Sequence, residues 1–126
     1  MPSFRTSFVA AFAACSLLAA GAAHAQAPNK GEKALTYRKA LYQVIAWNFG
    51  PMSAMAQGKA PYDAKEFALR AERVAAVAPL LAEAFPPESK GVANSKLKPA
   101  MWNERADFDA KMKDLLDRSA ALAAAA

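Results

Sequence analysis

An arginine heads a row of apolar side chains in the first third of the chain. Arg38, Tyr42, Ile45 and Phe49 recur at steps of three and four residues, which places them on one face of a helix. A guanidinium pairs with a carboxylate in a fixed two-point geometry, so this row suits a flat apolar ligand with an anionic edge. The alternative is a surface arginine whose methylene stem covers apolar neighbours, and periodicity alone favours that alternative.

Nucleophilic and metal chemistry have few residues to draw on. The chain has one cysteine, Cys15, and one histidine, His24, and we expect both to be removed on export. Catalysis of the Ser-His-Asp or Cys-His kind, and metal binding through these residue types, are therefore excluded for the mature chain. Four aspartates between residues 107 and 117 are interleaved with basic residues, a pattern typical of a solvated helix face. We predict that the protein is not an enzyme.

Residues 1–25 have the composition of a secretory signal peptide. A single arginine is followed by a mostly apolar stretch over residues 8–20, and the tripeptide ending at Ala25 is a small-x-small cleavage site. The apolar stretch is too short to span a bilayer. We therefore expect a periplasmic mature domain over residues 26–126 with no membrane attachment. A lipid anchor on Cys15 is the alternative.

The mature domain is small and mildly basic. Removal of the predicted signal peptide takes away one arginine and leaves a net charge of about +4 on 101 residues. This size and the high apolar content predict one compact domain. The spread of positive charge favours acidic partners without indicating nucleic acid. No disulfide can form within the mature domain, so its stability must come from packing, a cofactor or a partner.

The hydrophobic pattern predicts an all-α domain, because no alternating strand pattern is present. The predicted helices cover residues 31–57, 63–85 and 102–126. Gly50-Pro51 should bend or divide the first helix, and Pro79 should kink the second. A loop over residues 86–99 joins the second helix to the third.

Each predicted helix has apolar faces to bury. The second and third each carry one row, which indicates core packing; the rows are Phe67, Ala71, Val74, Ala78, Leu81 and Phe85, then Phe108, Met112, Leu115, Leu116 and Leu122, interrupted by Ser119. The first helix carries a second row beside the one headed by Arg38, made of Leu41, Val44, Asn48, Met52 and Met55. A helix with two such faces packs against more than one neighbour.

Four short motifs follow one another through the mature domain. They are Tyr37-Arg38-Lys39, Asn48-Phe49-Gly50-Pro51-Met52, Gly58-Lys59-Ala60-Pro61-Tyr62-Asp63 and Pro99-Ala100-Met101-Trp102. This ordered set resembles cytochrome c′ (cytochrome c prime), a family of periplasmic class II c-type cytochromes. The resemblance runs from about residue 30 to residue 126. It implies an antiparallel four-helix bundle that holds haem c.

The resemblance also implies roles for particular positions. Arg38 matches the arginine that pairs with a haem propionate, and Lys39 stands beside it at the haem edge. Tyr42 matches the distal position over the open face of the iron, and Ile45 matches an apolar position of the pocket.

The end of the chain departs from the family pattern. Trp102 and the loop before it, including Ser95, are implied to lie near the pocket edge. Family members continue into a last helix with a Cys-x-x-Cys-His motif, whose thiols attach the haem and whose histidine ligates iron. No such motif occurs here, and after Leu116 the sequence passes into alanines. We interpret residues 26–126 as three of the four helices. A fragment or a truncated gene product is favoured over a protein that works without covalent haem.

The leading hypothesis is a periplasmic haem c protein that transfers electrons or binds small diatomic gases at a five-coordinate iron. Its partners would be redox proteins or gas ligands, and the complete protein would form a homodimer. The alternative is a haem-free periplasmic helical protein that binds a partner, or itself, through its uncovered apolar rows.

Overall fold

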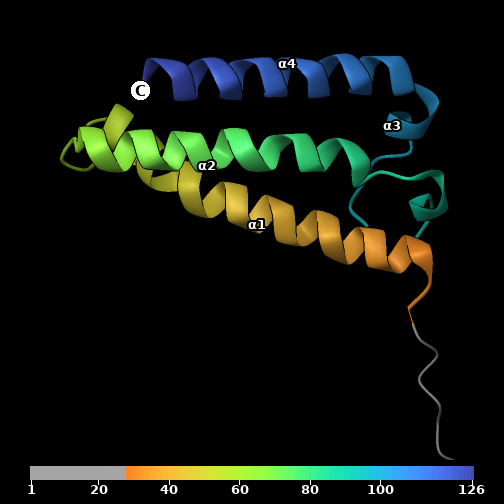
Figure 1. Ribbon diagram of the computed structural model, residues 1–126. Helices are drawn as coiled ribbons and strands as arrows, with labels where there is room; N and C mark the ends of the chain where they lie inside the picture. The colour runs from red at the N-terminus through yellow and green to blue at the C-terminus, as the bar shows by residue number, and fades with distance from the viewer. Residues whose placement is uncertain (1–27) are drawn as a thin grey trace, which may run out of the picture.

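Three long antiparallel helices form the domain in a computed structural model that describes residues 28–126. They are α1 (Lys30–Ala56), α2 (Ala64–Glu83) and α4 (Arg105–Ala125). The 3-10 turn η1 (Pro87–Ser89) and the single-turn helix α3 (Ala100–Asn103) lie in the connection from α2 to α4. Figure 1 shows α1, α2 and α4 running alternately back and forth, with α2 between the other two.

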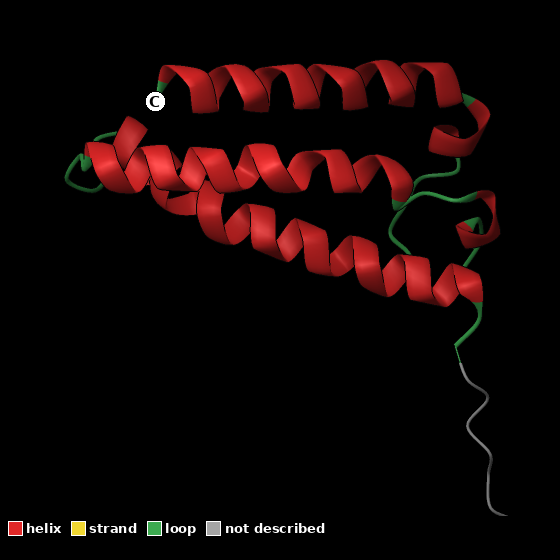
Figure 2. Ribbon diagram, viewed as in Figure 1, coloured by secondary structure: helices red, strands yellow, loops and turns green. Residues whose placement is uncertain are grey.

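The predicted all-α fold is confirmed, and the three long helices are those of an incomplete bundle. Every regular element within residues 28–126 is helical, as Figure 2 shows. None of the helices in this range is long and apolar enough to cross a membrane. The predicted signal peptide, with Cys15 and His24, lies outside the described residues.

Side-chain caps define where the first two long helices begin. At the start of α1, the Asn29 side chain accepts from the Glu32 backbone N–H, and the Glu32 carboxylate accepts from the Asn29 N–H, both at 2.9 Å. At the start of α2, the Asp63 side chain accepts from the Glu66 N–H at 3.0 Å. These bonds satisfy backbone donors that the first turn of a helix leaves unpaired.

The prolines do not divide the helices. α1 continues through Pro51 and α2 through Pro79; of the two outcomes predicted at Gly50-Pro51, a bend or a division, the division does not occur. A proline inside a helix costs one backbone hydrogen bond and some crowding. On the turn after Pro51, Met52 and Met55 are 2% and 8% exposed, and their burial favours continuing the helix.

The third predicted helix is observed as two. α3 ends at Asn103, and the backbone leaves the helical region at Glu104, with φ −115° and ψ 49°. α4 then runs to the end of the chain. Four ion pairs between residues four apart lie along its solvated face; they are Arg105–Asp109, Lys111–Asp107, Lys113–Asp117 and Arg118–Asp114.

The core gathers at the end of α2 where the loop begins. Its central cluster is Leu41, Leu81, Ala84 and Phe85, and Ile45, Val77, Leu97, Met101, Phe108 and Met112 pack around it. The Phe85 and Phe108 rings meet edge to face with centroids 4.7 Å apart, a favourable aromatic geometry.

Several positions in the predicted rows differ from expectation, since Tyr42, Phe49 and Leu115 are exposed as well as Val44. Val44, assigned to an apolar face of α1, is 45% exposed, because the buried stripe passes from Leu41 to Asn48 and leaves Val44 at its margin. Ser119, which interrupts the row of α4, is the residue of that helix that is buried, at 6% exposed. Its hydroxyl donates to the Leu116 carbonyl at 2.9 Å, so a small polar residue fits this contact without an unpaired donor.

Candidate functional site

A hollow of about 230 Å³ lies between the first half of α1 and the loop before α3. Its lining is Leu35, Arg38, Lys39, Tyr42, Ser95, Lys96 and Leu97; we call it the Arg38 hollow. Four of the six predicted site residues therefore meet here, three from α1 and Ser95 from the loop. Tyr42 is 48% exposed, so its ring stands at the open side.

Arg38 is buried, at 3% exposed. Its Nη1 donates to the Ala84 carbonyl at 3.0 Å and to Ser89 Oγ at 3.4 Å, and its Nη2 donates to Ser95 Oγ at 3.4 Å. Its guanidinium carbon lies 4.8 Å from the centre of the Phe85 ring. A surface arginine that only covers its neighbours would leave its charged head in water, so that alternative does not describe Arg38.

The C-terminal end of α2 explains why two arginines gather there. The last carbonyls of a helix have no partner within the helix, and the helix dipole places negative potential at that end. Arg38 donates to the carbonyl of Ala84, and Arg105 from α4 donates to that of Phe85 at 3.1 Å. The end of α2 thus ties α1 and α4 together through two guanidinium groups.

Positive charge dominates the hollow. Burial lowers the pKa of Arg38, and the nearby Tyr42 opposes that shift. No carboxylate within residues 28–126 forms an ion pair with Arg38, and Lys39 and Lys96 add two further cations to the lining. A buried cation without a counter-charge is costly, so an anion entering the hollow would be stabilised.

A second, apolar space follows along α1. It measures about 270 Å³ and is lined by Ile45, Phe49, Val74, Leu115, Arg118, Ser119 and Leu122, from α1, α2 and α4; we call it the apolar groove. The predicted site residue Ile45 lies here, one turn beyond Tyr42. Phe49 is 50% exposed and Leu115 is 37% exposed, so the lining is only partly covered by the described residues.

Trp102 lines neither of these two spaces. It lies in α3, where its neighbour Met101 packs on the core instead. Adjacent side chains on a helix point about 100° apart. Met101 faces the core, so Trp102 points in another direction.

Leu35 and Leu97, which line the Arg38 hollow, and Ser89, which bonds to Arg38, were not part of the predicted apolar rows or the predicted site. Leu35 precedes the periodic row, Leu97 stands between two lysines in the loop, and Ser89 follows a pair of prolines. Ser89 is 1% exposed and bonds to Arg38. A signal for Leu35 exists, since it is one helical turn before Arg38; none exists for the loop residues.

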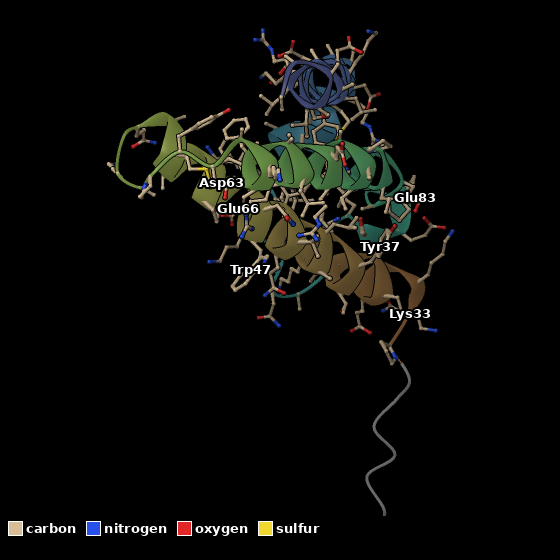
Figure 3. The ribbon with its side chains drawn as sticks, turned by 60° about the vertical axis from the view of Figure 1, so that its left-hand side comes forward. Lys33, Tyr37, Trp47, Asp63, Glu66 and Glu83 are labelled. Carbon is tan, nitrogen blue, oxygen red and sulfur yellow. The ribbon has the colours of Figure 1, made fainter. Side chains whose placement is uncertain are left out.

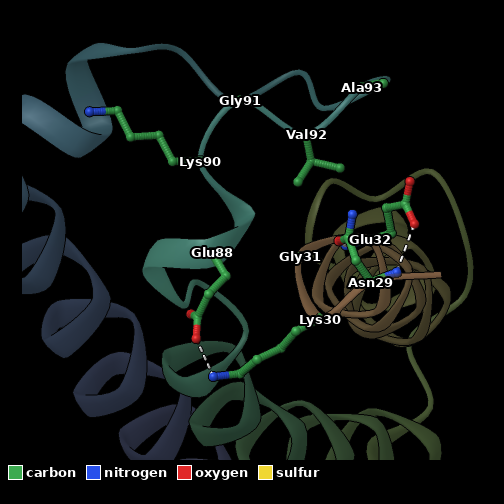
Figure 4. Close-up of a pocket in the computed structure, with 9 residues that line it drawn as sticks. All are labelled: Asn29, Lys30, Gly31, Glu32, Glu88, Lys90, Gly91, Val92 and Ala93. Atoms are coloured by element: carbon green, nitrogen blue, oxygen red, sulfur yellow. Dashed lines mark hydrogen bonds and ion pairs between the residues drawn. The ribbon is translucent and has the colours of Figure 1, made fainter.

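Another hollow, of about 550 Å³, lies at the start of α1 and combines charged with apolar lining residues (Figure 4). Three of its charged groups already have partners, since Lys30 binds Glu88 and the Glu32 carboxylate accepts from the Asn29 N–H. The backbone of η1 approaches α1 so closely that a Cβ on Gly31 would lie 2.2 Å from the Glu88 carbonyl oxygen. These contacts fix η1, and with it Ser89, against α1.

Comparison with known proteins gives this site its context. The family described as Cytochrome C′ matches residues 33–126, three quarters of the chain. The chain belongs to the cytochrome c′ family. Cytochrome c′ from Rubrivivax gelatinosus is 40% identical over 82 residues, covering 65% of this chain and 64% of that protein. Cytochrome c′ from Halomonas halodenitrificans is 54% identical over 54 residues, covering 43% and 41%. The chain thus aligns with less than two thirds of each of these relatives.

A solved structure agrees with this assignment. Cytochrome c prime from Shewanella frigidimarina superposes with a TM-score of 0.73 at 39% identity, over 79% of this chain and 77% of that one. The four-helix bundle is therefore the fold of the family, the described residues form three of its long helices, and family membership supports haem c as the cofactor.

The described residues fit part of the environment that haem c needs. The buried Arg38 has no carboxylate partner within residues 28–126, and the apolar groove further along α1 is lined by side chains of three helices. The iron ligand and the attachment cysteines are not among these residues, since the cysteine and the histidine of the chain precede residue 28. The fit is to the edge and one face of the haem.

Proposed function

We propose that residues 28–126 form the distal side of a periplasmic haem c protein of the cytochrome c′ type. Bound haem c supplies an iron that exchanges electrons or binds a small diatomic gas. The role is one of binding and electron transfer rather than catalysis. The observation that carries the proposal is the buried Arg38, held at the edge of a hollow that already contains Lys39, Tyr42 and Ser95.

Each residue of the Arg38 hollow has a distinct part in this proposal. Arg38 holds a haem carboxylate, because a guanidinium in a poorly solvated place binds carboxylate strongly. Lys39 adds positive charge at the same edge. Tyr42 stands over the approach to the open face of the iron and limits the size of ligand that passes. Ile45 provides apolar cover one turn further along α1.

The proposed partners follow from the same chemistry. The ligand at the iron would be a small diatomic gas, and electrons would pass to and from a redox protein. A modest positive charge favours an acidic protein surface for that exchange. Trp47 supports the proposed homodimer, since it is 76% exposed and points away from the bundle on α1, as Figure 3 shows.

A haem-bearing peptide tests the proposal. The peptide would carry a Cys-x-x-Cys-His helix with haem attached through both cysteines, and it would be titrated with the purified mature chain. We expect a saturable shift of the Soret band and a gain in helicity at one peptide per chain. A Soret band that stays unchanged at high chain concentration, while the chain remains folded, would contradict the proposal.

Tyr42 provides a finer test in the same complex. Tyr42→Ala should open the distal face, so carbon monoxide should bind the reduced haem faster, by about tenfold. Tyr62→Ala is the matched control, because Tyr62 is also exposed, at 65%, and lies in the turn between α1 and α2. Equal carbon monoxide association rates in the two variants would remove Tyr42 from the proposed site.

One observation favours the alternative of a haem-free interaction protein. The apolar groove exposes Phe49 and Leu115, and uncovered apolar surface of this kind promotes association. The alternative predicts an oligomer of defined stoichiometry for the chain alone, measured by light scattering with size exclusion. Phe49→Ser should then release monomers, whereas polydisperse material in both proteins would count against it.

A further inference from the structure

Ser89 forms two hydrogen bonds that together fix its orientation. Its hydroxyl donates to the Pro86 carbonyl at 2.8 Å, and its oxygen accepts from Arg38 Nη1 at 3.4 Å. Because the single hydroxyl hydrogen is used on Pro86, the oxygen can act only as an acceptor toward Arg38. The residue is 1% exposed, so water does not compete for this contact.

The contacts on Arg38 are unevenly distributed over its guanidinium. Both hydrogens of Nη1 have acceptors, the Ala84 carbonyl and Ser89 Oγ. Nη2 has one acceptor, Ser95 Oγ. Within residues 28–126, Nε and the second hydrogen of Nη2 have no acceptor. Nε and Nη2 form the side edge of the guanidinium, and this edge can bind both oxygens of one carboxylate.

The plane of the guanidinium is restrained as well. The Phe85 ring lies under it, with 4.8 Å between the guanidinium carbon and the ring centre, a cation–π contact. The Ala84 carbonyl and the Phe85 ring belong to the end of α2, and Ser89 belongs to η1. One short stretch of chain therefore sets both the position of Nη1 and the tilt of the group.

We propose that Ser89 is a positioning residue for Arg38, which keeps Nη1 on the protein so that the Nε and Nη2 edge faces a carboxylate in the Arg38 hollow. The identity of that carboxylate as a haem propionate rests on the proposed function, whereas the anchoring of Arg38 does not. A side chain fixed before its ligand arrives loses less conformational entropy on binding.

Ser89→Ala and Ser119→Ala form a matched pair to test this role. Both serines are buried, and both donate to the carbonyl three residues earlier, at 2.8 and 2.9 Å. Only Ser89 also accepts from Arg38. The two variants therefore remove the same local bond and differ in the contact with the guanidinium.

Nitrogen-15 NMR of the Arg38 side chain in the mature chain provides a readout independent of haem. We expect slow rotation and separate Nη signals in the unaltered protein and in Ser119→Ala, but merged or broadened Nη signals in Ser89→Ala. Backbone spectra would show that each variant is folded. If Ser89→Ala is unfolded, Ser89→Cys preserves more of the side-chain volume with a weaker acceptor, and the same merging is expected.

Sodium propionate is the probe for the open edge. Its titration, followed at Arg38 Nε, should give a dissociation constant that is about fivefold weaker in Ser89→Ala, the loss of roughly one hydrogen bond, and within twofold of normal in Ser119→Ala. Separate Nη signals that persist in Ser89→Ala would overturn the positioning role. Failure of the haem-bearing peptide to bind, with the Nη signals merging as expected, would count against the proposed function and leave the positioning role standing.

Discussion

The two hollows along α1 are built in different ways. The Arg38 hollow lies between α1 and the loop before α3, and its central charge has three hydrogen-bond acceptors, from the end of α2, from η1 and from that loop. The apolar groove is formed by side chains of three helices, with one charged group, Arg118, at its rim. One hollow is fixed by directional contacts and the other by the shape of neighbouring helices.

The two hollows also differ in how much their residues contribute to stability. Arg38 and Phe85 are 3% and 2% exposed, while Phe49 in the groove is 50% exposed. Substitutions at the Arg38 hollow should therefore destabilise the fold, and substitutions in the groove should mainly change what the surface binds. The comparison shows that the charged group that would recognise an anion, Arg38, is held by contacts that also stabilise the folded core.

Phe85→Ala should have the largest effect on stability. The ring fills the centre of the core and supports both Arg38 and Phe108, so its loss should cost about 3–5 kcal/mol of unfolding free energy. Phe49→Ala should cost less than about 1 kcal/mol, because much of that ring is in water. Urea unfolding of both variants measures the two free-energy losses. Equal losses of unfolding free energy would mean that the groove is as well packed as the core.

Arg38→Met should have the second-largest effect on stability. This change keeps the apolar stem but leaves the Ala84 carbonyl and Ser89 without their donor, at a cost of about 1.5–3 kcal/mol. Arg118→Met at the rim of the groove is the control, because its side chain is 79% exposed and it should leave stability unchanged. Thermal unfolding that ranks the two variants the other way would break the contrast between the hollows.

Substitutions at two glycines of α1 test how closely η1 packs against that helix. Gly31→Ala should destabilise by about 1–3 kcal/mol, since its Cβ would lie 2.2 Å from the Glu88 carbonyl oxygen. Gly50→Ala meets nothing within 4 Å and should stabilise the helix by about 0.5–1 kcal/mol. Opposite shifts in melting temperature are expected, and shifts of the same sign would show that η1 gives way easily.

The smallest expected effect depends on pH. A hydrogen bond from Lys30 lowers the pKa of Glu88 from its ordinary value of 4.5. A carboxylate with a lowered pKa stabilises the fold above pH 4.5, and this contribution is lost as pH falls through the lowered value.

Lys30→Met should therefore reduce the melting temperature slightly at pH 7, and its difference from the unaltered protein should shrink as pH falls below 4.5 and Glu88 becomes protonated. Lys59→Met, in the turn between α1 and α2, is the control and should show no such trend. A constant difference for Lys30→Met across this pH range would mean that the ion pair does not anchor η1.

The helices could be predicted because they follow a short-range pattern. Leu41, Leu81 and Phe108 obey helical spacing, and each packs where that spacing places it. The gathering of Arg38, Lys39 and Tyr42 was also accessible, since one helix carries all three. The resemblance to the family supplied Ser95, which the structure brings to the same hollow.

The rest depends on contacts that periodicity does not encode. Ser89 meets Arg38 because η1 packs closely against Gly31. Ser89 and Arg38 are 51 positions apart in the sequence. The break at Glu104 separates α3 from α4, and it follows from a backbone conformation rather than from a helix-breaking residue. Ser119 is buried because a small side chain fits where two helices meet. In a hydrophobicity pattern, the same serine counts as an interruption of the apolar row.

The most direct test of the central claim compares Arg38→Gln with Arg73→Gln in binding the haem-bearing peptide. Arg73 is an exposed arginine of α2, so its loss changes the net charge equally without touching the Arg38 hollow. If Arg38 holds the carboxylate edge of the haem, the dissociation constant read from the Soret band should weaken by about tenfold or more in Arg38→Gln. In Arg73→Gln it should change by less than about twofold. Equal dissociation constants for the two folded variants would contradict the account.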